Sequence, residues 1–465
     1  MGFDFLDLGF PKSGTDWKSI NGKPYITVSS KGRSNGLSTK INDGADFGPD
    51  TTLGATSPSQ TGTPYTQTSG IQEALDYAGT QSGQYDSRMP VYLKENTGFN
   101  NVFFINSPIN INYDNSIIIG NGFIQSTDSS INAINIGNAT TGISHLTIKN
   151  TGFWGFTNVF NVVRSASSSF SWNFENLTFA NISNAILIST ALSITPDVNF
   201  TDCVGGATYV MYLTVATDGI NFTNCTLGGD IYVALPSGYS TTLISLINSF
   251  QSGNVTLIGS GISGGNQNNG FLVMYNSSIN GNVTLTNSVI TAYISGIGGN
   301  LVFNANSYAF MHDCGYGNSG TGTRYIIQEN AGASGFALLD GGYALNLSTG
   351  TIETDDGTSV PVIVKNVVSQ TNPANIHLTS VNVNNSTPAV PTSGTAVQNT
   401  NPYAVNVYLY GGTVTEIQIT KNGTAYTVFS NASGLALSGQ VYKLNPSDEI
   451  TLTYSTAPTW EWLSD

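Results

Sequence analysis

The sequence predicts an all-β protein, a right-handed parallel β-helix followed by a C-terminal β-sandwich, and three observations support this prediction. Short β-branched and aromatic runs bounded by Gly, Asn or Pro recur along most of the 465 residues. The segment 198–204 returns 22 residues later as 220–226, and repeats of about 20 to 50 residues are typical of solenoids. Only 9% of the residues are charged, so most of the polar surface must be neutral.

The first part of the chain is expected to hold an attachment segment and the β-helix. Residues 1–40 carry mixed charges and turn signals, and we interpret them as an N-terminal segment that attaches the chain to a larger particle. Residues 41–383 are predicted to form the β-helix. A capping helix is expected near 70–79, where apolar residues recur at i, i+4 and i+7.

A linker and a second domain are predicted after the β-helix. Residues 384–400 are polar, contain proline and show no periodicity, which is typical of a linker. Residues 401–465 alternate apolar and polar side chains, and Asn422-Gly423 is a typical hairpin turn. We therefore expect a compact β-sandwich over 401–465.

The repeats also predict which side chains face inward. Alternation along each strand places one set of apolar residues in a single continuous column inside the helix. This set includes Phe200, Phe222, Leu257 and Leu285. Asn residues follow several strands, where the amide caps the backbone, tolerates a left-handed conformation and can form stacked ladders. These corner residues are Asn150, Asn181 and Asn224, and Cys203 and Cys225 are expected to stack beside them as small buried residues.

Charge and composition exclude several classes of partner. The net charge of −14 and the 14 Lys and Arg residues leave no basic patch for nucleic acid or an anionic membrane. No apolar run approaches about 18 residues, and the first residues lack a signal-peptide pattern, so neither membrane insertion nor export is predicted. The three cysteines form no CxxC pair, which excludes a cysteine-rich zinc site and a disulfide framework, and we expect no cofactor.

Four segments near the N-terminal end carry a resemblance to a known fold family. In order, they are 42–52, 70–78, 89–93 and 117–122. This series resembles the opening of pectin-lyase-like β-helix proteins, in which the short helix caps the first coil. The sequence departs from that pattern through a Ser/Thr/Gln-rich insertion between Thr52 and Gly70 and through the loss of the Gly-rich run after the helix, although the order of elements is kept.

The closing segment carries a second resemblance. Residues 401–419, with 444–446 and Tyr454, are similar to terminal modules of virion surface proteins, including those of viruses of thermophilic archaea. Together the two resemblances imply a homotrimeric tailspike or turret-like protein on the virion surface. Such a spike would contact other virion proteins through its N-terminal segment and attach the virion to host surface glycans or glycoproteins.

Two alternatives to an attachment spike stay open. One is a tailspike depolymerase, a glycoside hydrolase or polysaccharide lyase that cleaves host polysaccharide. The other is an adhesin-like surface protein of a cell. A depolymerase needs two carboxylates about 5 to 9.5 Å apart, or a base with a charge-neutralising cation. None of the ten carboxylates between 101 and 340 sits with another in a tight motif, which favours a protein without catalysis.

The weak catalytic candidates are Asp197, Asp202 and Asp218. The repeat stacks Asp202 beside Asn224 and could place Asp197 and Asp218 one rung apart, about 5 Å. Aspartate in a turn is more often a backbone cap, which is the default interpretation of all three.

Two further polar groups are not expected to bind a metal. His312, Asp313 and Cys314 are adjacent, so their side chains cannot easily converge. Asp355-Asp356-Gly357, near Glu353, lacks the spacing of a calcium loop and fits a hairpin turn.

Aromatic residues are the candidates for carbohydrate binding, because ring faces stack on sugars. Those spread over consecutive coils include Tyr209, Tyr212, Tyr232, Tyr239 and Tyr275. Some aromatic residues must instead lie in the core or in contacts between subunits. Fourteen Asn-x-Ser/Thr sequons are present, and those on turns are possible glycosylation sites. The candidates are Asn138, Asn276, Asn346, Asn422 and Asn431, whereas Asn199 and Asn221 lie in predicted strands.

Overall fold

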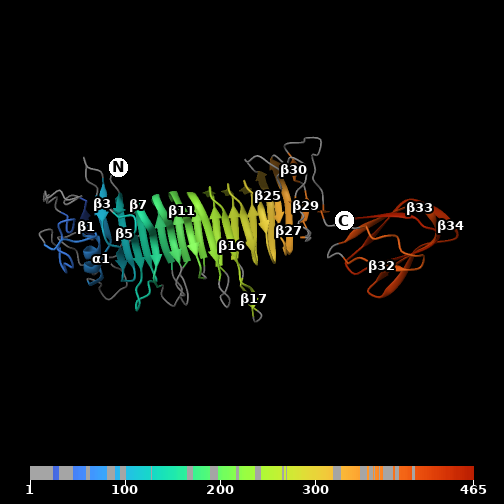
Figure 1. Cartoon of the computed structure of the whole chain (residues 1–465), viewed down its shortest axis with the longest axis horizontal. Coiled ribbons are helices and arrows are strands. Elements are labelled where there is room, and N and C mark those ends of the chain that lie inside the picture. The colour runs from blue at the N-terminus through green and yellow to red at the C-terminus, as the bar shows by residue number, and fades with distance from the viewer. Residues whose placement is uncertain are drawn as a thin grey trace, which may run out of the picture. The chain divides into compact units, whose positions relative to one another are not determined.

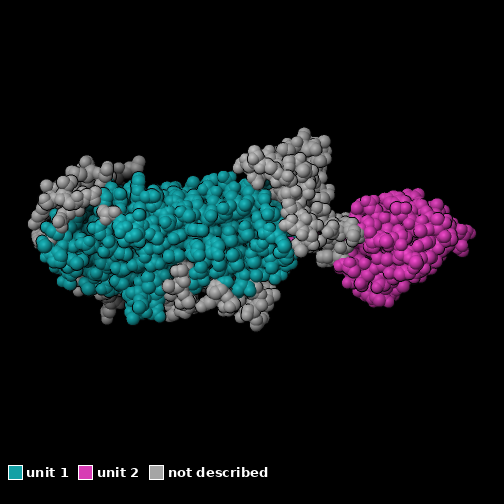
Figure 2. Space-filling view, viewed as in Figure 1, with its two compact units in different colours: residues 1–358, 365–378 teal, residues 359–364, 379–465 magenta. Residues whose placement is uncertain are grey.

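The computed structural model is nearly all-β and divides into two compact units (Figure 2). It describes residues 25–30, 45–58, 63–80, 89–94, 101–126, 128–164, 171–188, 197–215, 219–235, 242–263, 266–268, 270–317, 326–345, 353–354, 360, 362–365, 367–369, 381–382, 387–400 and 404–464. The first unit comprises residues 1–358 and 365–378, and the second comprises 359–364 and 379–465.

The first unit is a parallel β-helix, as predicted, whose strands stack rung on rung (Figure 1). Sheet A contains β1 (Ile26–Ser29), β2 (Val91–Lys94), the first parts of β5 (Ser116–Ser126) and β7 (Leu146–Val162), β8 (Ser171–Glu175), β10 (Asp197–Thr201), β12 (Gly219–Thr223), β14 (Thr242–Ile247), β19 (Gly270–Tyr275), β22 (Ser288–Tyr293), and the first parts of β25 (Ser307–Gly317) and β27 (Gly335–Leu345). Long strands turn the corner and enter the next sheet, so β7 takes part in all three.

Two further sheets close each coil. Sheet B contains β3 (Val102–Ile105), the later parts of β5, β7, β25 and β27, the first parts of β9 (Thr178–Ile188), β11 (Val204–Leu213) and β13 (Thr226–Ala234), and β15 (Phe250–Gln251), β20 (Ser278–Ile279), β23 (Gly296–Ile297) and β30 (Val368–Ser369). Sheet C contains β4 (Ile109–Ile111), β6 (Asn132–Ile136), the ends of β7, β9, β11 and β13, and β16 (Val255–Ile258), β21 (Val283–Thr286), β24 (Leu301–Phe303), β26 (Ile327–Glu329) and β28 (Glu353–Thr354). The short strands β17 (Gly261–Ser263) and β18 (Asn266–Asn268) pair antiparallel beside the coils.

The strand register confirms the predicted repeat. Val198 lies opposite Ile220 and Phe200 opposite Phe222, which is the 22-residue offset. Spacing drifts elsewhere, because Leu272 and its partner Ile290 are only 18 residues apart. Ladder pairing fixes the strands about 4.8 Å apart, while the turns between them vary in length.

The interior consists of several columns, and this corrects the expectation of one. Phe200 and Phe222 are buried in sheet A with their rings stacked 5.1 Å apart. Leu257 and Leu285 are also buried, but they pair with each other in sheet C. Each sheet turns alternate residues inward, so every inward position along a strand builds its own column.

A sharp corner joins sheets A and B on successive rungs. The corner residue has a positive φ of 46° to 55° in each of Asn150, Asn176, Asp202, Asn224, Asn248, Asn276, Ile294 and Asp313. This confirms the prediction for Asn150 and Asn224, and Asn181, within β9, also has the predicted left-handed conformation, with φ 52°. Side-chain ladders form as expected, for Asn176 donates to Asn150 at 2.8 Å and Asn276 to Asn248 at 2.9 Å.

From Asp202 onward, the residue after each of these corners points inward and is small. It is Cys203, Cys225, Ser249, Ser277, Ser295 or Cys314 on successive rungs, whereas the larger Leu177 follows Asn176. Their hydroxyl and thiol groups donate to backbone carbonyls of the neighbouring rung, as Ser277 does to Leu246 and Cys314 to Ala292. The predicted burial of Cys203 and Cys225 is confirmed.

The predicted capping helix is α1 (Ile71–Thr80), which contacts β1, β2 and β4. Its apolar face is buried through Ile71, Leu75 and Ala78. The Gln72 side chain accepts from the Asn110 backbone N–H at 2.6 Å and donates to its carbonyl at 3.1 Å. The helix is therefore attached directly to a strand of the first coils.

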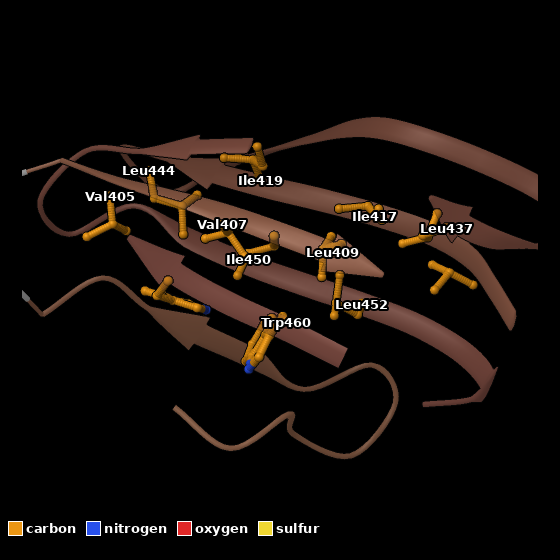
Figure 3. Packing of buried hydrophobic residues seen from close by; sticks show 12 residues of the cluster. Val405, Val407, Leu409, Ile417, Ile419, Leu437, Leu444, Ile450, Leu452 and Trp460 are labelled. Atoms are coloured by element: carbon orange, nitrogen blue, oxygen red, sulfur yellow. The ribbon is translucent and has the colours of Figure 1, made fainter. Parts of the chain in front are cut away.

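The second unit is an antiparallel sheet. Its strands are β32 (Ala396–Gln398), β33 (Val405–Lys421), β34 (Thr424–Leu444), β35 (Glu449–Thr456) and β36 (Thr459–Ser464), and β29 (Val362–Lys365) pairs with β31 (Val381–Asn382). Asn422 and Gly423, with φ 49° and 77°, form the predicted hairpin turn. Register shifts between Leu409 and Glu416 bend β33, and side chains from both sides of the bend share one core (Figure 3). Residues 396–398, inside the segment expected to be a linker, form a strand.

Candidate functional site

The outer face of sheet A changes character along the β-helix. On β7, β8, β10 and β12 its outward side chains are polar or charged. Asn221 donates to Asn199 at 2.9 Å, and Asn199 donates to Asn173 at 3.3 Å. Lys149 and Glu175 form an ion pair across neighbouring strands of the same face. We call this part, on β7, β8, β10 and β12, the polar half.

On the later rungs the same outward positions are mostly apolar, and we call this part the apolar face. It lies on β14, β19, β22, β25 and β27 and has three columns. The first column is Leu243, Phe271, Val289, Tyr308 and Phe336. The second is Ser245, Val273, Thr291, Phe310 and Leu338, and the third is Ile247, Tyr275, Tyr293, His312 and Asp340.

A separate group of aromatic side chains lies on the outer face of sheet C, and we call Tyr209, Tyr212 and Tyr232 the tyrosine cluster. The rings of Tyr212 and Tyr232 are stacked, with centroids 5.0 Å apart and planes at 17°. Tyr209 meets Tyr212 edge-on at 5.4 Å. Since the ring spacing matches the rung spacing, the pair lies along the helix axis, with one ring face at each end and its edges outward.

The outward column continues on both sides of Tyr212 and Tyr232, with threonines on one side and a leucine followed by an asparagine on the other. Thr256 is opposite Tyr232, and Thr284 follows on the next rung. In the other direction Leu187 is opposite Tyr212, and Asn161 follows. The column therefore offers two tyrosine rings, with their edges outward, together with hydroxyl and amide groups, a combination suited to a sugar.

The predicted carbohydrate-binding residues thus fall into two places. Tyr209, Tyr212 and Tyr232 come together on sheet C. Tyr275 lies on the apolar face and is 52% exposed. Tyr239 lies outside the described residues.

The described carboxylate candidates do not form a pair. Asp197 is the first residue of β10, and Asp202 follows its last residue. Five residues of extended strand separate them by about 16 Å, beyond the span of a glycosidase pair. Asp202 and Asn224 occupy the same corner on neighbouring rungs, as expected, and Asp202 donates its backbone N–H to the Thr223 carbonyl at 3.0 Å. Asp218 lies outside the described residues.

His312, Asp313 and Cys314 point in different directions, as expected. His312 faces outward with its ring stacked on Tyr293 at 5.2 Å. Asp313 is the corner residue, and Cys314 is buried. The described residues contain no group of three or more His, Cys, Asp or Glu side chains that could hold a metal ion. Asp355, Asp356 and Gly357 are not among the described residues.

The three thiols are shielded inside the helix. A hydrogen bond with Cys225 and burial together raise the pKa of the Cys203 thiol far above its ordinary value. Burial raises the pKa of Cys314 as well. The same hydrogen bond lowers the pKa of the Cys225 thiol. Because the thiolate is the reactive form, Cys203 and Cys314 fit a structural role and not a nucleophilic one.

The candidate sequons differ in how free their amides are. Asn138 donates its amide to Asn112 at 3.0 Å, and Asn276 donates to Asn248 within the corner ladder. Asn422 is exposed at the hairpin turn, and Asn431 is half-buried in β34. Asn346 lies outside the described residues, whereas Asn199 and Asn221 lie in β10 and β12 as predicted.

Sequence reasoning missed the apolar face as a unit. The signal was present, because each later repeat carries Val, Phe, Leu or Tyr at positions where the earlier repeats carry Asn, Thr or Ser. The pattern can be recognised only after the sequences of successive rungs are aligned, because the turns between them differ in length.

Within the described part of the chain, no helix has the length and apolarity needed to span a membrane. Comparison of the chain with models of protein families, with curated proteins and with solved structures found no match.

Proposed function

We propose that the chain is a virion surface spike that attaches the particle to host surface glycans or glycoproteins, with the tyrosine cluster as its sugar-binding site. The observation that carries the proposal is the stacked pair of outward tyrosines in a column of hydroxyl and amide side chains. The tyrosine rings offer apolar contact to a pyranose, and Thr256, one rung beyond Tyr232, offers it a hydroxyl. Asn161, two rungs beyond Tyr212, lies in the same column to meet another sugar of the same glycan. The small share of charged residues, 9% of the chain, fits a neutral ligand.

The separation of Asp197 from Asp202 favours binding without cleavage. A glycosidase needs an acid and a nucleophile or base on either side of one bond. These two carboxylates lie at opposite ends of β10. The spike is therefore proposed to hold its receptor and not to shorten it.

A glycan array probed with the purified chain tests the attachment function. Binding to one glycan class is expected, and the double variant Tyr212→Ala/Tyr232→Ala should weaken it at least about tenfold, the scale of one or two ring contacts. Tyr212→Phe/Tyr232→Phe keeps the rings and should retain most of the affinity.

Tyr426→Ala serves as the matched control, because Tyr426 is 53% exposed on β34 of the second unit. This variant should bind as the unchanged chain does. Equal binding by the double alanine variant would place the receptor site elsewhere. Shortened polysaccharide after incubation with the chain would contradict the proposal and favour the depolymerase, to be followed with Asp197→Asn and Asp202→Asn.

A further inference from the structure

The apolar face exposes more apolar side chain than a solvated sheet normally does. Parallel sheets in proteins are usually covered on both faces. Here the inward face of sheet A packs on the interior, while Tyr275, Tyr293 and Tyr308 on the outward face are 52%, 42% and 38% exposed. The exposure continues round the corner to Ile294, at 57%, and to Tyr343 on sheet B, at 45%.

The exposed area approaches that of a protein interface. Five large residues of the apolar face are 37% to 52% exposed: Leu243, Ile247, Tyr275, Tyr293 and Tyr308. Ile294 at the corner and Phe250 and Tyr343 on sheet B extend this exposed surface. With roughly 150 to 250 Å² for a full aromatic side chain, the five present on the order of 400 Å², and all eight on the order of 600 Å². Half-buried neighbours such as Phe310 and Phe336 bring the total near the roughly 800 Å² that each partner of a standard interface buries.

We propose that the apolar face is an interface with a second copy of this chain, which presents the same face. Two copies that each carry a net charge of −14 repel one another over most of their surface. The apolar face holds no Lys, Arg or Glu, and its one carboxylate, Asp340, lies at its edge. The copies can therefore meet there without burying like charges, and the aromatic, charge-poor composition is that of an interface core.

The composition argues against other occupants of this face. A sugar needs hydrogen-bond partners beside the ring faces, and the middle column offers only the hydroxyls of Ser245 and Thr291. A nucleic acid or an anionic surface needs cations, which are absent from the face. A flat sheet face matches its own copy directly, because two sheets pack face to face about 10 Å apart.

The test places one charge in the middle of the apolar face and the same charge on the polar half. Thr291 lies between Val273 and Phe310 in the middle column. Thr147 lies in the corresponding column on β7, with the same side chain and similar half-burial. In a single copy a lysine at either position can extend to water. In the proposed complex, T291K would bury an ammonium group without a partner.

Sedimentation of the full chain measures the outcome. The unchanged protein and T147K are expected to sediment with at least twice the 49.0 kDa mass of one chain, and T291K at 49.0 kDa, with association weakened at least about a hundredfold. Circular dichroism should show the same fold for all three. If T291K fails to fold, Tyr275→Ser/Tyr293→Ser removes apolar area instead of adding charge and should give the same dissociation.

Two results would overturn the proposal. One is a single-chain mass for the unchanged protein at micromolar concentration. The other is assembly of T291K as tight as that of T147K. If the unchanged protein has a single-chain mass and T291K loses glycan binding, the apolar face is the receptor-binding site. A result on assembly alone leaves the tyrosine cluster untouched, so the two proposals fail separately.

Discussion

The polar half and the apolar face belong to one continuous sheet, yet they present different chemistry to their surroundings. Their inward columns are alike, for Phe222 on β12 and Met311 on β25 occupy the same column and both are fully buried. Their outward columns differ, since Asn199 in the polar half corresponds to Val273 on the apolar face. Folding of a rung therefore requires apolar residues on its inward side only. The identity of the outward residues is determined by the solvent or partner that they contact.

This difference separates the side chains that stabilise the coil from those that meet partners. Inward side chains lose contact with water in every rung, which stabilises the helix by about 1.5 to 3 kcal/mol for each large residue. Outward side chains gain little from folding alone. An outward apolar residue thus points to a contact outside the single chain.

The largest effect is expected for the inward column. Phe222→Ala should lower the free energy of unfolding by about 3 to 5 kcal/mol, because it leaves a cavity beside the stacked ring of Phe200. Met311→Ala should cost about 2 to 5 kcal/mol for the same reason. Urea unfolding followed by tryptophan fluorescence measures both.

The outward neighbours of these residues are the matched controls. Asn221→Ala and Phe310→Ala should each change the unfolding free energy of the single chain by less than about 1 kcal/mol. A cost for Phe310→Ala as large as for Met311→Ala would show that the apolar face is part of the folding core.

Most of the β-helix could be predicted from the sequence, because its causes are local. The offset between Phe200 and Phe222, the left-handed corner at Asn224 and the helix near Ile71 each follow from residue type and spacing. The number of interior columns could not, because alternation gives a direction for each side chain but not the sheet to which its strand belongs.

The candidate site was only partly predictable. Tyr212 and Tyr232 were recognised as candidates, but their stacking depends on the register of β11 and β13. Tyr275 was grouped with them, although it lies on another sheet, since the number of residues between corners varies from coil to coil. The full length of β33 could not be predicted either, because the bend after Leu409 interrupts the alternation without ending the strand.

A smaller effect is expected in the buried amide ladder of sheet C. Asn158 donates to Asn132 at 2.6 Å and accepts from Asn184 at 2.7 Å. Asn158→Ala leaves both neighbours without this partner and should cost about 1 to 3 kcal/mol of unfolding free energy. Asn199→Ala, in the more exposed ladder, should cost less than about 1 kcal/mol, because water replaces the lost bonds. Equal losses of unfolding free energy in the two variants would show that burial does not increase the contribution of the amide ladder.

The Cys314 thiol should make stability fall at high pH. Burial raises the pKa of Cys314 above its ordinary value of 9.0, so the folded state keeps this proton where the unfolded chain releases it. Stability is therefore complete below pH 9 and declines above it, by up to about 1.4 kcal/mol per pH unit for one thiol. Cys314→Ser keeps a donor to the Ala292 carbonyl, because Ser277 makes the equivalent hydrogen bond to Leu246. This variant should show a shallower decline in stability between pH 9 and 10. An unchanged slope would mean that Cys314 ionises freely in the folded chain.

The smallest effect on folding, and the most informative about the two halves, is expected from exchanging their outward residues. Val273→Asn and Asn199→Val should each shift the single-chain unfolding free energy by less than about 0.5 kcal/mol, because neither side chain contributes to the interior. Their effects on assembly should differ. Association makes the melting temperature of the unchanged protein rise with protein concentration, and Val273→Asn should remove that rise while Asn199→Val keeps it. If both variants behave alike, the outward residues of the two halves are equivalent, and the apolar face has no partner that distinguishes it from the polar half.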